Sequence, residues 1–360
     1  MFIDNNISIA IINSGGIRKY HSCLKSLKNS IDLNQTKIFR FVEKQTRGQT
    51  LNLIIKKIGT KNDLLIVADD IKFTKGWFEK LIRNKDKAEI WGTNMLYPKT
   101  NIIQDNGYEI INLNNSALLS PINRGKKFLN YSKKEWHYRD CCCGCFLYLT
   151  QKALTYQKKF YPEYGANRWD ELSYILKAKD KGLKLAVLNH NLFHEGISTK
   201  NHHKMKFRTI SYQIEKKLWN KFQKKFINLK LIKKKILINF DKKIIKLVEN
   251  KYNKILFYGA GIFSETFIKK DILNIKNVSF CSGLKEEIGK KIGNYKIVDV
   301  KKININNFNS VVITSEDSAK KIYDNNFNLR LKKKWEGNFY KIQTKKTNNL
   351  WTYSINEIRQ

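Results

Sequence analysis

Short apolar runs alternate with stretches of helical periodicity over the first two hundred residues, and this alternation restricts the fold more than any other feature. Runs that predict strands lie at five places: Ile7–Asn13, Lys37–Val42, Asp63–Ala68, 143–150 and 185–188. Helical patterns follow the first strand, ending at Leu27, and the second strand, over 51–58. Strands that alternate with helices in this way predict an α/β fold with a mostly parallel sheet. The polar segment 97–130 is predicted to be rich in loops.

The rest of the chain divides into three parts. Residues 210–252 carry apolar positions at intervals of three and four with lysines between them, which predicts a basic amphipathic helical linker after a first domain of residues 1–209. The lysine face is either solvated, on a pair of interdomain helices, or lies on an anionic membrane surface. Residues 253–345 predict a second, smaller Rossmann-like α/β domain, and 346–360 a C-terminal tail.

The second domain contains a partial dinucleotide-binding fingerprint. Gly259 and Gly261 follow a predicted strand, KILFY, and open a helix, but Ser264 replaces the third glycine. The next predicted strand ends in FCSG, where a ribose-binding acid would be expected. These departures favour a scaffold or an unidentified ligand over NAD.

The chain is strongly basic, with 69 Lys and Arg against 31 Asp and Glu and a net charge of +38. Such a charge suits a polyanionic partner such as nucleic acid, anionic lipid or a phosphorylated substrate. However, lysine, asparagine and isoleucine are enriched all along the chain, and aromatic residues are not interleaved with the basic ones as in RNA-binding motifs. We therefore expect no nucleic-acid partner.

Targeting signals and cysteine spacing favour a cytoplasmic protein. The stretch MFIDNNISIAIINSGG has no basic run ahead of its apolar residues and is interpreted as a first strand rather than a signal peptide. No run approaches the ~18 apolar residues of a membrane-spanning helix. Six cysteines without framework spacing favour a reducing compartment, with peripheral attachment at the inner face of the cell membrane as an option.

The segment LLIVADDIKFTKGWFEKLI, residues 64–82, carries the strongest chemical signal. A predicted strand runs directly into Asp69 and Asp70, and Gly76-Trp77 then opens a helix. The carboxyl end of a central parallel strand is where such sheets bind ligands. Two carboxylates there suit Mg²⁺ or Mn²⁺, which prefer oxygen ligands, although a solvated Asp-Asp turn is the simpler alternative.

Two later stretches add ionisable groups to this candidate site. Asp170 and Glu171 stand at the predicted start of a helix, where carboxylates also serve as structural caps. His190 and His194 follow the predicted strand 185–188. His194 is placed to complete a metal site, although a lone histidine is more often structural.

Taken in order and spacing, these stretches resemble the GT-A glycosyltransferases, specifically the large inverting group often called family 2. The resemblance covers residues 5–200, and its motifs are ISIAIIN, the acid Glu43, Ala68-Asp69-Asp70 as a DXD-type motif, Gly76-Trp77, GTNMLYPKTNIIQDNG, a glycine-containing strand at Cys143-Gly144-Cys145, the acidic pair and the later histidine. It implies a metal-dependent inverting transfer of a sugar from a nucleotide-sugar donor to a hydroxyl group. The implied acceptor is a surface glycan, as in a polysaccharide, lipopolysaccharide, glycoprotein or lipid-linked glycan.

The resemblance also implies which residues bind the donor. Asp70 and His194 would hold the divalent metal, Mn²⁺ or Mg²⁺, on the donor diphosphate. Asp69 would contact the donor sugar or ribose, and Glu43 the nucleoside. Asn13 and Gly144 would complete the donor pocket.

Catalysis is implied to depend on the acidic pair. Glu171 aligns with the general base and Asp170 with the acid before it. Two departures matter: Ala68 replaces the first acid of the DXD-type motif, and the usual Glu-Asp order is reversed, which leaves open which carboxylate is the base. The alternatives are a catalytically weak module that binds nucleotide-sugars and, more remotely, a nucleic-acid binder.

Four cysteines surround Gly144 in the sequence RDCCCGCF: Cys141, Cys142, Cys143 and Cys145. On a predicted strand, neighbouring side chains point to opposite faces, so these thiols cannot all converge on one ion. A zinc site of the usual kind needs a second cysteine pair such as C-x₂-C elsewhere in the chain, and Cys23 and Cys281 do not have that spacing. The resemblance places this segment on the acceptor side of the pocket, where small residues leave room for sugar. We interpret the cysteines as small apolar side chains, with a metal or a redox centre as alternatives.

Overall fold

The structure of the 360-residue chain is a computed structural model that divides into two compact units. It describes residues 7–14, 16–31, 36–43, 46–113, 116–128, 134–161, 169–195, 212–232, 234–259, 261–269, 277–283, 285, 287–314, 322–324, 335–346 and 350–358. The first unit contains Met1–Ile111, Ala117–Thr209 and Lys221–Ile232. The second contains Asn112–Ser116, Ile210–Asn220 and Lys233–Gln360.

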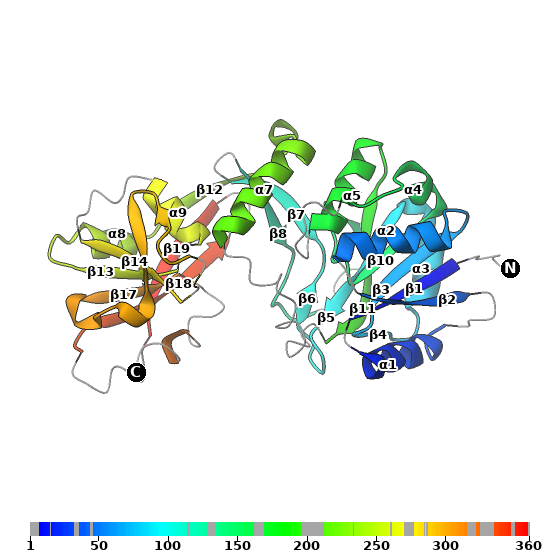
Figure 1. Cartoon of the computed structure of the whole chain (residues 1–360), viewed down its shortest axis with the longest axis horizontal. Helices are drawn as coiled ribbons and strands as arrows, with labels where there is room; N and C mark the ends of the chain where they lie inside the picture. The colour runs from blue at the N-terminus through cyan, green and yellow to red at the C-terminus, as the bar shows by residue number, and fades with distance from the viewer. Residues whose placement is uncertain are drawn as a thin grey trace. The chain divides into compact units, whose positions relative to one another are not determined.

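The first unit is built on a mixed sheet (Figure 1) with strand order β2-β1-β3-β10-β5-β11-β4. Outside this order, β6 pairs with β5 and β9 pairs with β11. Its strands are β1 (Ile7–Asn13), β2 (Lys37–Val42), β3 (Asp63–Ala68), β4 (Ile71–Lys72), β5 (Ile90–Leu96), β6 (Ile103–Asp105), β9 (Trp136–Tyr138), β10 (Phe146–Leu149) and β11 (Leu185–His194). β1 pairs in parallel with β2 and β3, and β5 pairs in parallel with β11. β10 lies antiparallel between β3 and β5. The parallel pairs confirm the α/β prediction.

Helices cover both faces of this sheet, which explains why β1 is buried along its whole length. The helices are α1 (Ile17–Lys28), α2 (Arg47–Ile58), α3 (Trp77–Asn84), α4 (Gln151–Tyr156) and α5 (Trp169–Asp180), with a 3₁₀ turn, η1 (Lys85–Lys87). α1 and α3 bury Leu27, Trp77 and Leu81 in one core with Ile9 of β1. A sheet covered on both faces needs strands that are apolar throughout, as ISIAIIN is.

Three segments of the first unit differ from their predictions. The segment 97–130 contains β6 and two further strands, β7 (Tyr108–Leu113) and β8 (Ser116–Pro121), so the prediction of a loop-rich region was wrong. The predicted strand 143–150 begins only at Phe146, because Gly144 and Cys145 form a turn ahead of it. β11 continues past 188 to include both histidines.

The segment 210–252 is not helical throughout. α7 (Tyr212–Phe226) and η3 (Leu229–Leu231) are followed by a strand, β12 (Lys235–Phe240), and then by α8 (Lys242–Glu249). In β12 alternate side chains are buried, namely Ile236, Ile238 and Phe240, a period of two that the helical interpretation overlooked. On α7, Phe222 and Phe226 are buried, and Phe226 packs edge-to-face on Tyr161 within the first unit. This packing is evidence against a free apolar stripe on α7.

The second unit carries a sheet whose central strands are parallel. Its elements after β12 and α8 are β13 (Ile255–Tyr258), α9 (Ile262–Lys269), β14 (Val278–Ser282), β15 (Lys291–Ile292), β16 (Tyr295–Asp299), η4 (Val300–Lys302), η5 (Ile305–Asn307), β17 (Ser310–Ile313), β18 (Asn338–Lys346) and β19 (Leu350–Glu357). Strands β16, β14, β13, β17 and β18 are parallel to one another in this order. At one end β15 pairs antiparallel with β16, and at the other β19 lies antiparallel to β18 and parallel to β12. Within the segment predicted as a C-terminal tail, residues 350–357 form β19, which lies inside the sheet between β18 and β12. No helix in the described part of the chain is long and apolar enough to span a membrane.

Candidate active site

The ends of several strands meet at one edge of the first sheet. Ile12 pairs with Ala68, so Asn13 and Asp69 lie side by side where the parallel strands β1 and β3 end. The amide of Ala68 donates to the carbonyl of Cys145, 2.9 Å away, which brings the turn before β10 to the same edge. His194, the last residue of β11, pairs with Ile71 just after Asp70. The structure thus brings together the residues that the sequence analysis placed at strand ends.

Asp69 is held rigidly from β1. Its side chain is 3% exposed, and its Oδ2 accepts a hydrogen bond of 2.5 Å from Nδ2 of Asn13. Oδ1 of Asn13 in turn accepts hydrogen bonds from the Arg40 guanidinium at 2.6 and 3.0 Å. Asn13 therefore fixes the orientation of the Asp69 carboxylate, and Arg40 fixes that of Asn13.

Asp70 faces His194. The distance from Asp70 Oδ1 to His194 Nε2 is 3.3 Å, and Nδ1 of His194 lies 3.0 Å from Oε1 of Gln104. Burial by itself would raise the pKa of Asp70, but His194 and Lys19 outweigh it and lower that pKa. Burial would lower the pKa of His194, but the Asp70 carboxylate outweighs it and raises that pKa. The two side chains form an ion pair when both are charged.

The fit of Asp70 and His194 to a divalent metal can be tested on their own atoms. Asp70 Oδ1 is buried and has no aligned hydrogen-bond donor among the described residues, as expected of an oxygen that has a further ligand to bind. Within that part of the chain, no group of three or more His, Cys, Asp or Glu side chains is placed so that it could hold a metal ion. The pair therefore fits as two protein ligands, with the remaining positions left to substrate oxygens and water, as is usual for Mg²⁺.

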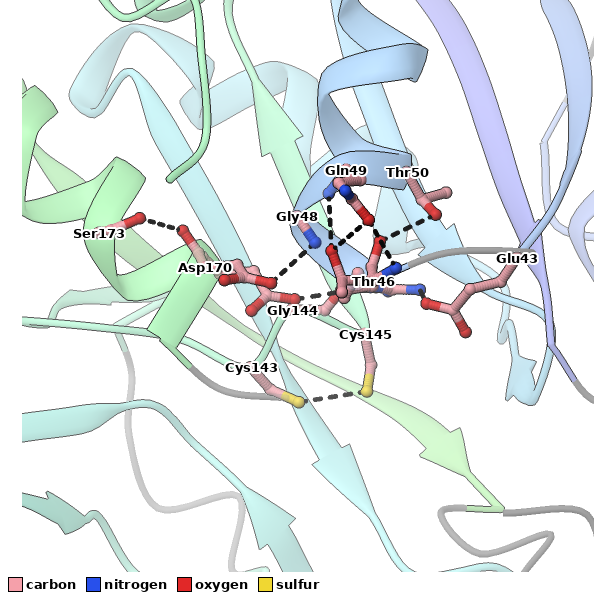
Figure 2. Close-up of polar contacts among 12 residues, drawn as sticks. Glu43, Thr46, Gly48, Gln49, Thr50, Cys143, Gly144, Cys145, Asp170 and Ser173 are labelled. Carbon is pink, nitrogen blue, oxygen red and sulfur yellow. Dashed lines mark hydrogen bonds and ion pairs between the residues drawn. The ribbon is translucent and has the colours of Figure 1, made fainter. Parts of the chain in front are cut away.

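Asp170 is bound to the N-terminus of α2. Its side chain is 1% exposed, and its Oδ2 accepts a 2.7 Å hydrogen bond from the backbone amide of Gly48 (Figure 2). α2 begins with a capping box, in which Thr46 and Gln49 satisfy each other's backbone amides. The free N-terminal amides and the helix dipole both stabilise a carboxylate, so Asp170 joins α5 to α2.

Glu171 lies against Gly144. A Cβ atom at Gly144 would be 2.0 Å from Oε1 of Glu171, so any other residue at this position would require the Glu171 side chain to move. The Glu171 side chain is nearly buried, and its Oε1 lies 3.6 Å from Nε of Arg47. Burial raises the pKa of Glu171, and the Arg47 charge opposes that rise without cancelling it. Gly144 was predicted on a strand, but it belongs to the turn that receives this carboxylate.

Arg47 connects these groups and was missed by the sequence analysis. Its Nη1 lies 3.8 Å from Oε1 of Glu43, its Nε faces Glu171, and its Nη2 donates a 3.0 Å hydrogen bond to the carbonyl of Gly144. A signal was present, since Arg47 is the first residue of α2 and the helix dipole disfavours a cation there. Glu43, which was predicted to meet a nucleoside, thus lies within ion-pair distance of Arg47.

Asp105 is a second residue that the sequence analysis missed. It ends β6, is 6% exposed, and accepts a 2.9 Å hydrogen bond from the amide of Gly107. Burial raises its pKa, against the opposing effects of Tyr108, Gly107 and more distant charges that include His194. Its sequence signal is the turn Asp105-Asn106-Gly107 at the end of an apolar segment.

His190, by contrast, is structural. Its Nε2 lies 2.8 Å from Oγ1 of Thr74, and burial together with the charge of Lys80 lowers its pKa to about 4. A neutral imidazole held by a threonine hydroxyl stabilises the start of α3 rather than the metal pair.

The four clustered cysteines fall into two groups. Cys141 and Cys142 are buried, and Cys142 packs where a side chain on Gly92 of β5 would otherwise lie. Cys143 and Cys145 are partly exposed on either side of Gly144, with their sulfurs 3.2 Å apart (Figure 2). The first pair agrees with the interpretation of small apolar side chains. The second pair is not on a strand, so the argument that neighbouring thiols point apart does not hold for it.

Neither a protein-family model nor a curated protein sequence matches the chain. Comparison with solved structures returns glycosyltransferases, the class that the sequence resembles. GalNAc-T7 with UDP, GalNAc and Mn²⁺ is 10% identical with a TM-score of 0.38, and the match covers 53% of this chain but only 44% of that one. S. aureus TarS 1–349 with UDP-GlcNAc is 10% identical with a TM-score of 0.39, over 62% of this chain and 67% of that one. The catalytic domain of Drosophila β1,4-galactosyltransferase 7 with xylobiose is 11% identical with a TM-score of 0.35, over 65% and 86%. At these TM-scores the matches carry no argument about donor, acceptor or metal, which rest on the site itself.

Proposed function

We propose that the chain is an inverting GT-A glycosyltransferase that moves a sugar from a nucleotide-sugar donor to a hydroxyl of a glycan acceptor. The observation that carries the proposal is the meeting of two carboxylate pairs at one edge of the first sheet, Asp69-Asp70 after β3 and Asp170-Glu171 at the start of α5. The turn that contains Gly144 lies between them, since it hydrogen-bonds to the end of β3 and packs against Glu171. One pair then serves the donor and the other the acceptor.

Glu171 is the proposed general base. Oδ2 of Asp170 accepts the hydrogen bond from the Gly48 amide, so this carboxylate anchors the helix that carries the base. The contact of Glu171 with Arg47, 3.6 Å, is longer than the hydrogen bond from Gly48 to Asp170, 2.7 Å. The pKa of Glu171 is raised, which brings it closer to the pH at which a carboxylate acts efficiently as a general base. In the reaction, Glu171 takes the proton of the acceptor hydroxyl as that oxygen attacks the anomeric carbon from the side opposite the leaving diphosphate. Inversion at the anomeric carbon follows from this single displacement.

Asp70 and His194 are the proposed holders of Mn²⁺ or Mg²⁺. A divalent metal there would neutralise the charge that develops on the departing diphosphate. Asp69, oriented by Asn13, would contact the donor sugar or ribose. Glu43 and Gly144 would complete the donor pocket, with Glu43 nearest the nucleoside.

The acceptor is proposed to be a surface glycan or a lipid-linked glycan at the cytoplasmic face of a membrane. Attachment to an anionic membrane would depend on the lysines of residues 210–252, because Phe222 and Phe226 are buried. Vesicles of anionic and of neutral lipid distinguish this attachment from simple packing, since only charge-driven binding falls with salt.

A calorimetric titration of the purified protein tests the proposal. UDP-, GDP-, dTDP- and CMP-sugars are added with and without Mn²⁺ to the wild type, to Asp70→Asn and to Glu171→Gln, with the exposed Asp86→Asn as a matched control. We expect one nucleotide class to bind only with Mn²⁺, and Asp70→Asn to weaken that binding by at least about tenfold. Glu171→Gln should still bind the donor but lose about 10²–10⁴-fold in transfer or in slow donor hydrolysis.

The second candidate function, a nucleotide-sugar-binding module without turnover, is favoured by one observation. Ala68 stands where the DXD-type motif has its first acid, and its side chain cannot contact a metal. Metal-dependent binding without hydrolysis or transfer to any acceptor would select this candidate. Binding that ignores both Mn²⁺ and the substitution of Asp70 would contradict both functions.

A further inference from the structure

The turn before β10 carries a pair of thiols that the proposed reaction does not use. Cys143 and Cys145 are free and partly exposed, and Cys143 donates a hydrogen bond to the Cys145 sulfur over 3.2 Å. The other four cysteines, Cys23, Cys141, Cys142 and Cys281, are buried. The chain thus separates one accessible dithiol from four protected thiols.

We propose that Cys143 and Cys145 form a modification site for small-molecule disulfides. There the two thiols are oxidised to an intramolecular disulfide, which changes the position of Gly144 against Glu171. A disulfide has an S–S distance of about 2.05 Å, so the sulfurs need to approach by only about 1 Å. Gly144, which lies between them, has no side chain to oppose the tightening of the turn. An oxidised small thiol such as glutathione disulfide is the oxidant.

The reaction proceeds by two exchanges. The Cys145 thiolate attacks one sulfur of the glutathione disulfide, the S–S bond of the reagent breaks, and one glutathione leaves and takes up a proton. The sulfur of Cys143 then loses its proton, attacks Cys145 in the mixed disulfide and expels the second glutathione, which takes up that proton. Two electrons pass from the protein to the reagent, and the products are one protein disulfide and two glutathione thiols.

The order of the two thiols follows from their hydrogen bond. Cys143 is the donor, and this hydrogen bond raises the pKa of Cys143 well above its ordinary value. Cys143 therefore keeps its proton at rest and acts second. Since the second exchange needs the Cys143 thiolate, disulfide formation should become faster as the pH rises.

The consequence for the active site comes through Gly144. Its carbonyl accepts the hydrogen bond from Arg47, and its Cα packs against the Glu171 carboxylate. Tightening of the turn moves both contacts, so the oxidised protein should hold Glu171 in a different position. This consequence rests on the proposed function, whereas the disulfide itself does not.

Mass spectrometry of the intact full chain tests the disulfide independently of any activity. The folded, reduced protein should take up two alkyl groups from N-ethylmaleimide. After treatment with glutathione disulfide, the protein should be lighter by two hydrogens before any labelling. It should then take up no alkyl group while folded and four alkyl groups once denatured. Cys143→Ser and Cys145→Ser should each abolish the loss of two hydrogens, and the buried matched control Cys281→Ser should leave it intact.

Contrary outcomes are equally clear. A stable mixed disulfide with one glutathione in the wild type, six free thiols after oxidation, or a disulfide that persists in Cys143→Ala would overturn the proposal. If the disulfide forms and dithiothreitol restores an at least tenfold loss of sugar transfer, the coupling to Glu171 is supported. If the disulfide forms and transfer is unaffected, the coupling is wrong. A protein that forms the disulfide but transfers no sugar in either state contradicts the proposed function instead.

Discussion

Replacement of Gly144 by alanine tests how the active site is assembled. The added Cβ would lie 2.0 Å from Oε1, 2.4 Å from Cδ and 2.6 Å from Cγ of Glu171. Ordinary contact begins near 3.5 Å, so the carboxylate must move by about 1.5 Å. Gly144 does not have a positive φ, so backbone strain adds nothing to this steric effect.

The magnitude follows from what Glu171 loses when it moves. Overpacking of a buried site costs about 1–3 kcal/mol. Removing one partner of a buried ion pair costs about 3–5 kcal/mol, but Arg47 keeps Glu43 at 3.8 Å, so the lower part of the combined range applies. We expect the free energy of unfolding to fall by about 2–3 kcal/mol, and the melting temperature by about 4–12 °C for a unit of this size. A displacement of 1 Å at a catalytic group lowers turnover by about 10²-fold.

The assay compares thermal melting and donor hydrolysis in Gly144→Ala with those in Gly261→Ala, where an added Cβ meets nothing within 4 Å. The decisive comparison uses a second background. In Glu171→Ala the clash is absent, so adding Gly144→Ala should cost less than about 0.5 kcal/mol there. If Gly144→Ala lowers the free energy of unfolding equally in both backgrounds, or if its melting and donor hydrolysis match the wild type, the contact between Gly144 and Glu171 does not position the carboxylate.

Three further substitutions have expected outcomes. Arg47→Met should lower sugar transfer and move the acidic limb of the pH–rate profile to higher pH, because the Glu171 pKa rises further once its counter-charge is lost. Arg47→Lys should recover part of the transfer. An unchanged pH–rate profile in Arg47→Met would contradict the ion pair. The His194 pKa is raised above its ordinary 6.5 in the folded state, so protonated His194 stabilises the fold. In metal-free buffer, His194→Asn should therefore lose the most stability relative to wild type below pH 6.5, and the difference should disappear as the pH rises through the raised pKa. Calorimetric melting at several pH values measures this difference. Trp77→Phe should lower the free energy of unfolding by about 1–3 kcal/mol, because it leaves the buried Ser30 hydroxyl without the indole donor 2.9 Å away, and denaturant unfolding measures it.

The strands of the first unit were predictable because their signal is local. β1, β2 and β3 have the bounds that their apolar runs predict, since each run is framed by polar or turn residues. α2 begins at Arg47 rather than at 51 because the capping box of Thr46 and Gln49 was overlooked. Attention to caps, as well as to apolar periodicity, would have found the correct start.

Lysine enrichment obscured the second unit. KILINF alternates buried and exposed side chains, but the lysines before and after it extend the helical periodicity of its neighbours. β19 also pairs with β12 over a hundred residues earlier in the chain, and nothing in the local pattern of 346–360 indicates that partner. A strand recruited from the end of a chain is therefore easily mistaken for a tail.

The candidate site shows the same division between local and distant information. Asp69, Asp70 and His194 could be chosen as candidates because an ionisable residue at the end of an apolar strand is visible in a short window. The contacts among Arg47, Gly144 and Glu171 join three segments separated by many residues, and no window contains them. Yet each left a local anomaly: a cation at a helix N-terminus, a glycine among cysteines, and a carboxylate on a helix that is buried at its start. The three residues contact one another directly, so they are best understood, and best mutated, as one unit.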